Sequence, residues 1–289
     1  MNANVSPSHR VRLVATRVLL AGALTWALAQ NASAGLKHRY SFETDNQVID
    51  SVGGANGTIM NNASVSGGAA YLPASVASGP TCDYIELPSG MITGLTSVTF
   101  EIWMDALENA NWVEVFAFGN QNTSGQGAHM VMFCPHSGST PSDFRMSYAQ
   151  ASPGYNDEYV VNGGAPLDNL GPAFIACVYD PPNNVLSLYK DGVLVGSLSP
   201  PVSAGFSLSK VNNQFSWLGR SLYNGDAAYN GYIDEFRIHD TALGPLQIAV
   251  DSRAGMNTVV TDIVVNSVDW SANPTMTVGS RQSTAVTFN

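Results

Sequence analysis

NNQFSWLGRSLYNGDAAYNGYIDEFRIHDTAL, residues Asn212 to Leu243, is the stretch that decides the fold. It predicts a strand at Phe215 to Arg220, a polar loop, and an alternating strand at Tyr232 to His239. Successive side chains of a strand point to opposite faces, so four residues are expected on one face of this strand: Tyr232, Asp234, Phe236 and Ile238. An aspartate on an otherwise apolar face needs a partner, and we expect the strand to close a β-sandwich.

The first 34 residues have the pattern of a secretory signal peptide. Three arginines precede a mostly apolar run at residues 18–29, and Ala32-Ser33-Ala34 fits a signal peptidase site. The apolar run is shorter than the roughly 20 residues that span a bilayer. We therefore predict a signal peptide at residues 1–34 and an exported protein, either secreted or held at the cell surface.

The charge of the remaining chain limits its partners. Nine Lys and Arg stand against 22 Asp and Glu in residues 35–289, which gives a formal charge of −13. Nucleic acids and anionic membranes attract basic surfaces. We therefore expect no nucleic-acid partner and no membrane insertion once the leader is removed. An acidic protein remains suited to divalent cations and to neutral partners such as glycans.

Short strands separated by turn residues make up the rest of the chain. Asn56-Gly57 and Asp191-Gly192 mark tight turns. Ala173 to Tyr179 is nearly all apolar, as in a strand buried on both faces. Pro245 begins the one predicted helix, which runs to about Ala254. Residues 35–256 are thus predicted to form an all-β domain, a two-sheet antiparallel jelly-roll sandwich with one short C-terminal helix.

Residues 257–289, here called the tail, follow the predicted sandwich. Strand-like runs are found at Val259 to Val265, Thr275 to Val278 and Ser283 to Phe288. A segment of about 30 residues cannot bury a core of its own. The tail either packs on the sandwich or begins a further β-domain, and we favour the second alternative.

Three cysteines follow the leader: Cys82, Cys134 and Cys177. An odd count allows one intramolecular disulfide at most, and Cys82 with Cys134 is the one pair to consider. Cys177 lies in an apolar run and is predicted to be a small buried hydrophobe. The absence of a Cys-x-x-Cys motif or a Cys/His cluster argues against a zinc site.

Eight segments follow one another between Arg39 and Ile248: RYSFE, DSVGGANGTI, GGAAYLPA, DYIELP, SVTFEIWMD, FIACVYDPPNNVLSLYKDGVLVGS, WLGRS and YNGYIDEFRIHDTALGPLQI. Their order and spacing resemble the laminin-G-like jelly-roll family of the concanavalin A-like lectin/glucanase superfamily. The resemblance implies a curved sandwich in an exported or surface protein that binds glycans or extracellular proteins. It implies no particular ligand, because function on this fold lies in variable loops.

The resemblance also implies a structural calcium ion between the loop after the first strand and an aspartate of the final strand. The matching positions are Glu43, Asp50, the loop carbonyls around Gly54 to Asn56, and Asp234. Calcium takes about six to eight oxygen ligands. The alternative is that Asp234 accepts hydrogen bonds from loop amides and Asp50 caps its own turn.

Aromatic and polar residues of the loops are the candidate glycan ligands. Sugars stack on exposed aromatic rings and form hydrogen bonds with Asn and Asp side chains. The candidates are Trp112, Tyr155, Tyr159, Tyr223, Asn224, Asp226 and Tyr229. The alternative is that many of these rings cover the edges of the core.

A third hypothesis is glycoside hydrolysis. Glucanases of the superfamily place acidic residues at alternate positions of one strand, across the scissile bond. The nearest stretch holds Glu101, Asp105 and Glu108, but Trp103 fills the central position that must be acidic. We therefore expect no enzyme activity and expect Trp103 to pack.

These observations together predict an exported, non-catalytic recognition or adhesion module that binds carbohydrate. The competing interpretation is a structural or protein–protein interaction module without sugar binding, because both use the same scaffold. The position of the loop aromatics discriminates between the two. Convergence on one groove favours glycan binding, and scatter over the surface favours the interaction module.

Overall fold

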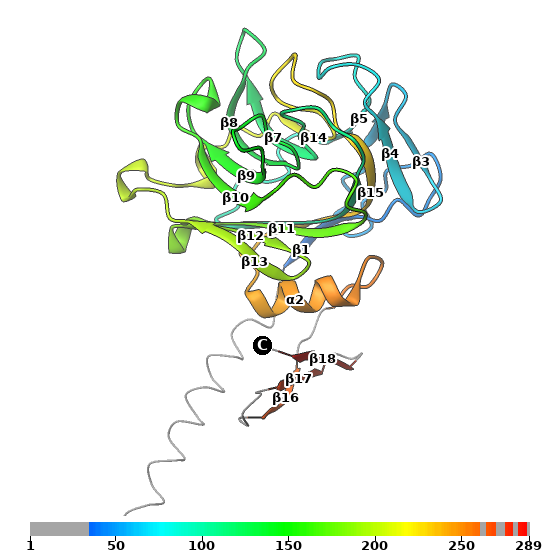
Figure 1. The fold of residues 1–289 in the computed structure, drawn as a ribbon, viewed down its shortest axis with the longest axis vertical. Helices are drawn as coiled ribbons and strands as arrows, with labels where there is room; N and C mark the ends of the chain where they lie inside the picture. The colour runs from blue at the N-terminus through cyan, green and yellow to red at the C-terminus, as the bar shows by residue number, and fades with distance from the viewer. Residues whose placement is uncertain (1–34, 261–263, 270–274, 280–282, 288–289) are drawn as a thin grey trace, which may run out of the picture.

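The computed structural model describes residues 35–260, 264–269, 275–279 and 283–287 (Figure 1). The predicted signal peptide lies outside the described residues. Two antiparallel sheets pack face to face, which confirms the predicted all-β sandwich. The first, here called the helix-side sheet, has the order β13 (Val193–Leu198), β12 (Val185–Lys190), β11 (Ala173–Asp180), β6 (Val98–Ala106), β15 (Asn230–His239), β4 (Ala69–Pro73) and β3 (Ser64–Ser66), with β1 (Leu36–Tyr40) also paired to β15.

The second sheet, here called the loop-side sheet, has long loops over its outer face (Figure 1). Its order is β10 (Tyr159–Gly164), β9 (Phe144–Ala149), β8 (Gly127–Cys134), β7 (Phe116–Gln121), β14 (Phe215–Leu218), β5 (Tyr84–Leu87) and β2 (Thr58–Met60). Single-turn 3₁₀ helices occur in the connections: η2 (Gly154–Asn156), η3 (Pro181–Asn183), η4 (Val202–Ala204) and η5 (Leu208–Lys210).

An aromatic cluster joins the two sheets. The ring of Phe100 on β6 lies 4.5 Å from that of Phe116 and 5.1 Å from that of Phe118, both on β7, measured between centroids. Phe236 on β15 lies 5.9 Å from Phe100, and all four side chains are fully buried. Alternation within each strand brings these rings to the inner faces, where they supply a large share of the apolar burial.

A bulge in β15 changes the predicted faces of that strand. Its pairing with β6 shifts register between Ile233 and Glu235, so that Asp234 is the extra residue. Ile233, Phe236 and Ile238 therefore point into the core, and Tyr232 is 38% exposed. The prediction of a shared face for Tyr232, Asp234, Phe236 and Ile238 was wrong, because one inserted residue reverses the alternation across it.

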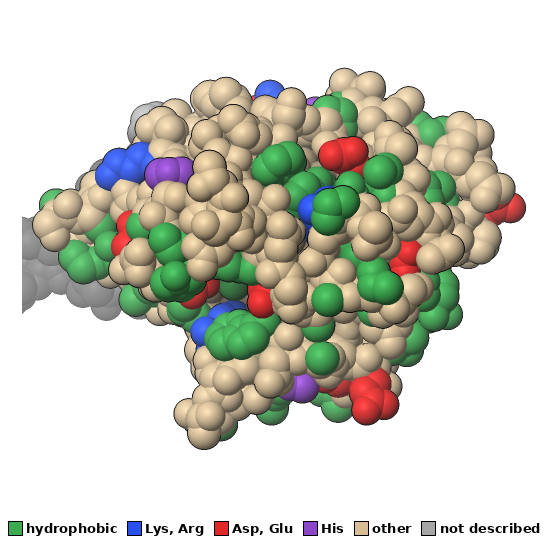
Figure 2. All heavy atoms as spheres, turned by 90° about the horizontal axis from the view of Figure 1, so that it is seen from above, with side chains coloured by type: hydrophobic (Ala, Val, Ile, Leu, Met, Phe, Trp, Pro, Cys, Tyr) green, Lys and Arg blue, Asp and Glu red, His purple; other side chains and the backbone are tan. Residues whose placement is uncertain are grey.

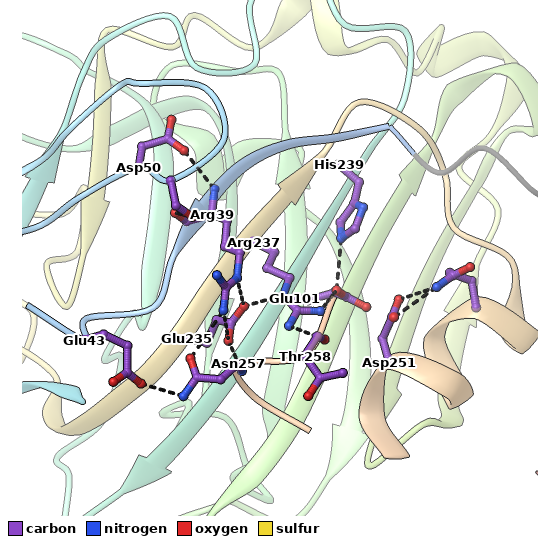
Figure 3. Close-up of polar contacts among 12 residues, drawn as sticks. Arg39, Glu43, Asp50, Glu101, Glu235, Arg237, His239, Asp251, Asn257 and Thr258 are labelled. Atoms are coloured by element: carbon purple, nitrogen blue, oxygen red, sulfur yellow. Dashed lines mark hydrogen bonds and ion pairs between the residues drawn. The ribbon is translucent and has the colours of Figure 1, made fainter. Parts of the chain in front are cut away.

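The outer face of the helix-side sheet carries a charged cluster, defined by Arg39, Glu101, Glu235, Arg237 and His239, of which all but the partly exposed Arg39 are buried (Figure 3). The Glu235 carboxylate accepts hydrogen bonds from the Nε atoms of Arg237 at 2.6 Å and Arg39 at 2.7 Å. His239 Nε2 lies 3.0 Å from Glu101 Oε2. Buried charges are tolerated when they pair in this way, and the cluster ties three strands together.

Helix α2 (Pro245–Ala254) covers this face of the sheet (Figure 1). Pro245 occupies the first turn, and Gly255 follows the last one with a φ of 79°. Ile248 packs with Trp103 and Phe174 beneath the helix. The predicted helix and the predicted packing of Trp103 are both confirmed.

Three further strands lie in the tail: β16 (Val264–Asp269), β17 (Thr275–Gly279) and β18 (Ser283–Thr287). They form an antiparallel sheet of their own. The first begins later than the predicted run at Val259 to Val265. That the tail starts a further domain stays a prediction.

All three cysteines are buried and unbonded. Cys177 lies in the core between the sheets, as predicted. Cys82 and Cys134 belong to one apolar cluster on the outer face of the loop-side sheet, without a disulfide between them. Within the described residues, no helix is long and apolar enough to cross a membrane.

Candidate functional site

A two-part cleft starts over the outer face of the loop-side sheet and continues along loops to the ends of β4 and β15. Its deep part, here called the pocket, has a volume of about 240 Å³, and its lining is Trp112, Glu114, Met132, Cys134, Tyr155, Glu158, Tyr223 and Asp226. Its shallow part, here called the groove, has a volume of about 640 Å³ and shares Trp112 and Asp226 with the pocket. Figure 2 shows apolar and acidic side chains around hollows on this face.

Strand alternation on β8 builds the floor of the pocket. Met132 and Cys134 point outward, while Val131 and Phe133 between them point into the core. The strand is buried on both faces, as its nearly continuous apolar sequence requires. The floor is thus a rigid apolar surface rather than a loop.

Aromatic rings form the walls. Tyr155, which is 57% exposed, stacks on Tyr223 with ring centroids 6.2 Å apart. Trp112 is 38% exposed and has a φ of 63°, and its backbone amide donates to the His136 carbonyl at 2.8 Å. A bulky residue in the left-handed region stores about 1–3 kcal/mol of strain, which persists at sites where the position of a side chain matters.

Two of the three pocket carboxyls have raised pKa values. Burial, followed by the nearby charge of Asp226, raises the pKa of Glu114 well above its usual range. Glu114 is 3% exposed, and its Oε2 accepts a hydrogen bond from the Leu222 amide at 3.0 Å. Burial also raises the pKa of Asp226 to about 6, against the hydrogen bond that it accepts from Ser221 Oγ at 2.9 Å.

The Tyr223 hydroxyl is buried without a hydrogen-bond partner among the residues that the structure describes. The backbone amide of Tyr155 approaches this oxygen but does not reach hydrogen-bond geometry. Buried polar atoms are normally paired, so this hydroxyl is an exception within the wall of the pocket.

The structure brings four of the predicted glycan ligands together in the pocket: Trp112, Tyr155, Tyr223 and Asp226. Asn224 lies beside them, where its Oδ1 accepts a hydrogen bond from Gln121 Nε2 at 3.1 Å. Tyr159 and Tyr229 line neither part of the cleft. Tyr159 stacks on Tyr148 at 6.2 Å, and Tyr229 is fully buried with its hydroxyl donating to the Asp105 carbonyl.

Glu114 and Glu158 were missed by the sequence analysis. Glu114 stands between Val113 and Val115 in a mostly apolar run, and an acid in such a run was the available signal. Glu158 carries no comparable signal, because it lies in a polar loop that resembles many others.

The three predicted calcium ligands do not form one site. In the part of the chain that the structure describes, no group of three acidic, His or Cys side chains is arranged to hold a metal ion. Glu43 accepts a hydrogen bond from Asn257 Nδ2, and burial together with the Asp105 charge raises the pKa of Asp234. Calcium binding stays a prediction, tested by the melting temperature with calcium and with chelator.

Asp50 caps its own loop, the alternative foreseen for it. Its carboxylate accepts hydrogen bonds from the amides of Arg39, Val52, Gly53 and Ala55 at 2.9–3.1 Å and lies 2.6 Å from His38 Nδ1. Burial opposes ionisation, but these hydrogen bonds outweigh it and lower the pKa of Asp50 to about 2. The carboxylate thus closes the loop without another ligand.

This arrangement predicts a loss of stability in acid. The pKa of Asp50 is lower in the folded state than the roughly 3.9 of an unfolded chain, so its stabilisation is complete above pH 4 and is lost as the pH falls to about 2. Asp50→Asn should cost on the order of 2 kcal/mol at pH 7, because its NH₂ group would face amide donors. Urea unfolding across this range measures both effects. An unchanged acid slope in the variant would contradict the assignment.

Known proteins resemble the chain in fold rather than in sequence. Domain 4 of AbnA, a GH43 extracellular arabinanase from Geobacillus stearothermophilus solved with arabinotriose, is 21% identical with a TM-score of 0.57. The match covers 75% of this chain and 98% of that domain. A botulinum neurotoxin type C structure, from work on its interaction with gangliosides, is 12% identical with a TM-score of 0.56, covering 88% of this chain and 63% of that one.

At these identities the likeness concerns the sandwich alone. No curated protein matches the chain. The family is shown by the sequence itself, because the laminin-G-like model of the superfamily matches residues 79–249, more than half of the chain. This segment contains the aromatic cluster, the pocket and the first half of α2. The chain therefore belongs to the concanavalin A-like lectin/glucanases superfamily, as a laminin-G-like member.

Proposed function

We propose that this protein is a carbohydrate-binding module that holds a glycan in the cleft of the loop-side sheet. The observation that carries the proposal is the convergence of three ring-bearing residues, Trp112, Tyr155 and Tyr223, on a pocket that also holds carboxyl groups. A concave, largely apolar site with a few polar groups is the usual form of a small-ligand site. The rings offer stacking faces, and the carboxyls accept hydrogen bonds from sugar hydroxyls.

The cleft suits an oligosaccharide rather than a single sugar. The pocket and the groove share Trp112 and Asp226, so a chain bound in one continues into the other. The groove loop is fixed, because Asn109 Oδ1 accepts a hydrogen bond from the Asn230 amide at 2.7 Å and Asn230 Nδ2 donates to the Glu108 carbonyl. A fixed loop loses little conformational entropy on binding.

The similar folds support a glycan as the ligand class. The arabinanase domain was solved with arabinotriose, and the type C neurotoxin interacts with gangliosides. We also propose that the module acts outside the cell and is not catalytic. Glu101, the start of the stretch closest to a glucanase motif, lies beneath α2 with His239 and Arg237 rather than in the cleft.

Trp112→Ala is the test of the proposal. The ring is shared by both parts of the cleft, and removal of a central aromatic anchor is expected to weaken binding of a neutral oligosaccharide about 10-fold or more. Isothermal titration calorimetry with a panel of arabinose, glucose and N-acetylglucosamine oligomers measures this.

Tyr232→Ala is the matched control. Tyr232 is also 38% exposed and stacks on Tyr71 at 4.8 Å, but it lines neither the pocket nor the groove. Its loss should leave binding unchanged. An absence of binding to every oligomer by the wild-type protein would overturn the proposal in favour of a protein-interaction module. Equal losses in the two variants would place the site elsewhere.

A further inference from the structure

The lining of the pocket is rich in acids and carries no basic group. Three of its residues are acids, Glu114, Glu158 and Asp226, and none is Lys, Arg or His. The nearest guanidinium, that of Arg145, lies 5.4 Å from the centre of the Trp112 ring. Its Nε and Nη2 atoms donate to both oxygens of Asp143 at 2.6 and 2.7 Å, so its charge is already matched.

The guanidinium of Arg220 also contacts residues outside the pocket. Arg220 lies over the ring of Trp217 at 3.7 Å and over that of Tyr84 at 4.9 Å, and it does not line the pocket. The residues that line the cavity thus include three acids and no cation. Because burial of carboxyl groups without a partner is unfavourable, their retention here indicates a bound positive charge.

The pKa values agree with this arrangement. Burial and then the charge of Asp226 raise the pKa of Glu114, and burial raises that of Asp226. Glu158 adds its charge to the surroundings of Glu114. Cys134 is the remaining titratable group on the floor, and burial raises its pKa well above the usual range, so it stays neutral. A cation between the acids would relieve this repulsion.

The ring faces point to the same ligand chemistry. Aromatic faces attract ammonium groups within about 6 Å, and aromatic rings combined with carboxylates are a common means of holding such groups. Trp112, Tyr155 and Tyr223 supply the rings.

We propose that the pocket takes the protonated amino group of an amino sugar, with neighbouring units of the same oligosaccharide in the groove. This inference rests on the proposed carbohydrate-binding function. The groove favours a sugar chain over a free amine as the ligand. It continues from the pocket past Trp112 and has a volume of about 640 Å³, which a free amine would leave empty. N-acetylation removes the charge, and a uronic acid reverses it, so both should bind less well.

Calorimetry with three tetramers tests the charge preference: glucosamine, N-acetylglucosamine and galacturonic acid. At pH 7 and low salt, the glucosamine tetramer should bind about 10-fold more tightly than the N-acetylated one, a difference of about 1.4 kcal/mol. The galacturonic acid tetramer should bind most weakly. The preference should shrink in about 0.5 M NaCl. It should also shrink as the pH falls below about 6, where Asp226 takes up a proton.

Single substitutions test which carboxylates cause the preference for the charged tetramer. Asp226→Asn and Glu158→Gln should each reduce the ratio of the glucosamine affinity to the N-acetylglucosamine affinity about threefold or more, since each removes one carboxylate from the pocket. Asp45→Asn is the control. It removes the same charge from an exposed loop, and the amide oxygen still accepts from the Gly67 amide. Its ratio should equal that of the wild type.

The outcomes separate the two proposals. Equal affinity for the charged and the acetylated tetramer would overturn the amino-sugar inference and leave the carbohydrate function standing. Binding of no tetramer would overturn the amino-sugar inference, and the carbohydrate function would fall with it only if the arabinose and glucose oligomers also failed to bind. Choline is the probe for a free ammonium ligand, and binding of choline without any tetramer would overturn the amino sugar in favour of a small cation.

Discussion

Arg237→Ala is expected to destabilise the fold by about 3–5 kcal/mol, because it removes one partner from a buried set of charges. The Arg237 side chain is 1% exposed and lies on β15, an inner strand of the helix-side sheet (Figure 3). Its Nε donates to Glu235 at 2.6 Å, its Nη1 lies 3.7 Å from Glu101, and its guanidinium lies 4.3 Å from the centre of the Trp103 ring. Alanine would leave both carboxylates with fewer partners and open a cavity over Trp103.

Two other variants make the measurement specific. Arg237→Lys keeps the charge but lacks the planar fork that serves two carboxylates, so an intermediate loss is expected. Arg253→Ala, at an exposed position in the last turn of α2, should change stability by about 0.5 kcal/mol or less. Urea unfolding followed by tryptophan fluorescence gives all three values. A loss below about 1 kcal/mol for Arg237→Ala would contradict the role given to the cluster.

Asp251→Asn is expected to stabilise the protein at neutral and alkaline pH. Asp251 lies on the buried face of α2, 2% exposed, and Gln247 Nε2 donates to both of its oxygens at 3.0 and 2.9 Å. Burial first, and then the charge of Glu101, raise the pKa of Asp251 to about 8, although Gln247 and Arg237 act in the opposite direction. His239 and Arg237 are the other charged groups around Glu101.

The direction in which wild-type stability changes with pH follows from proton binding by Asp251. Between pH 4 and pH 8 the folded state holds a proton on Asp251 that the unfolded chain releases at about 3.9, so wild-type stability falls as the pH rises through this range. The loss amounts to several kcal/mol, because each pKa unit corresponds to about 1.4 kcal/mol. Asparagine keeps an N–H donor toward the neighbouring Glu101 at every pH, and Glu101 Oε1 has no partner among the described residues.

Unfolding free energies measured from pH 5 to pH 9 check this prediction. The variant should show a flatter profile and exceed the wild type in stability at pH 8. Asp191→Asn, at the exposed turn between β12 and β13, should leave the profile unchanged, because the amide oxygen still accepts from Phe174. A variant less stable than the wild type at pH 8 would show that Asp251 is ionised in the folded protein.

Local patterns were sufficient to predict most of the sandwich. The apolar run Ala173 to Tyr179 is β11, and Pro245 to Ala254 is α2, because burial on both faces and a proline in the first helical turn leave a direct mark on sequence. The bulge at Asp234 leaves no such mark. It depends on the register against β6, a strand more than a hundred residues earlier in the chain.

The candidate site was predicted in part for a similar reason. Trp112, Tyr155, Tyr223 and Asp226 lie in polar loops, and their loops meet at one pocket. Tyr229 lies in the same polar stretch as Tyr223 but turns inward to donate to the Asp105 carbonyl. The local sequence is alike for the two tyrosines. Only the path of the loop over the sheet decides which ring faces the cleft.

The charged cluster and α2 have a further consequence for how the module is displayed. Both β1 and the segment after α2 run along the helix-side sheet, where Asn257 and Thr258 bond to Glu235 and Arg237 (Figures 1 and 3). The pocket opens on the opposite sheet. A support or neighbouring module tethered through either segment would therefore stand behind the cleft rather than across it. Several copies on one scaffold would present parallel clefts to a polymer and gain avidity without any new contact.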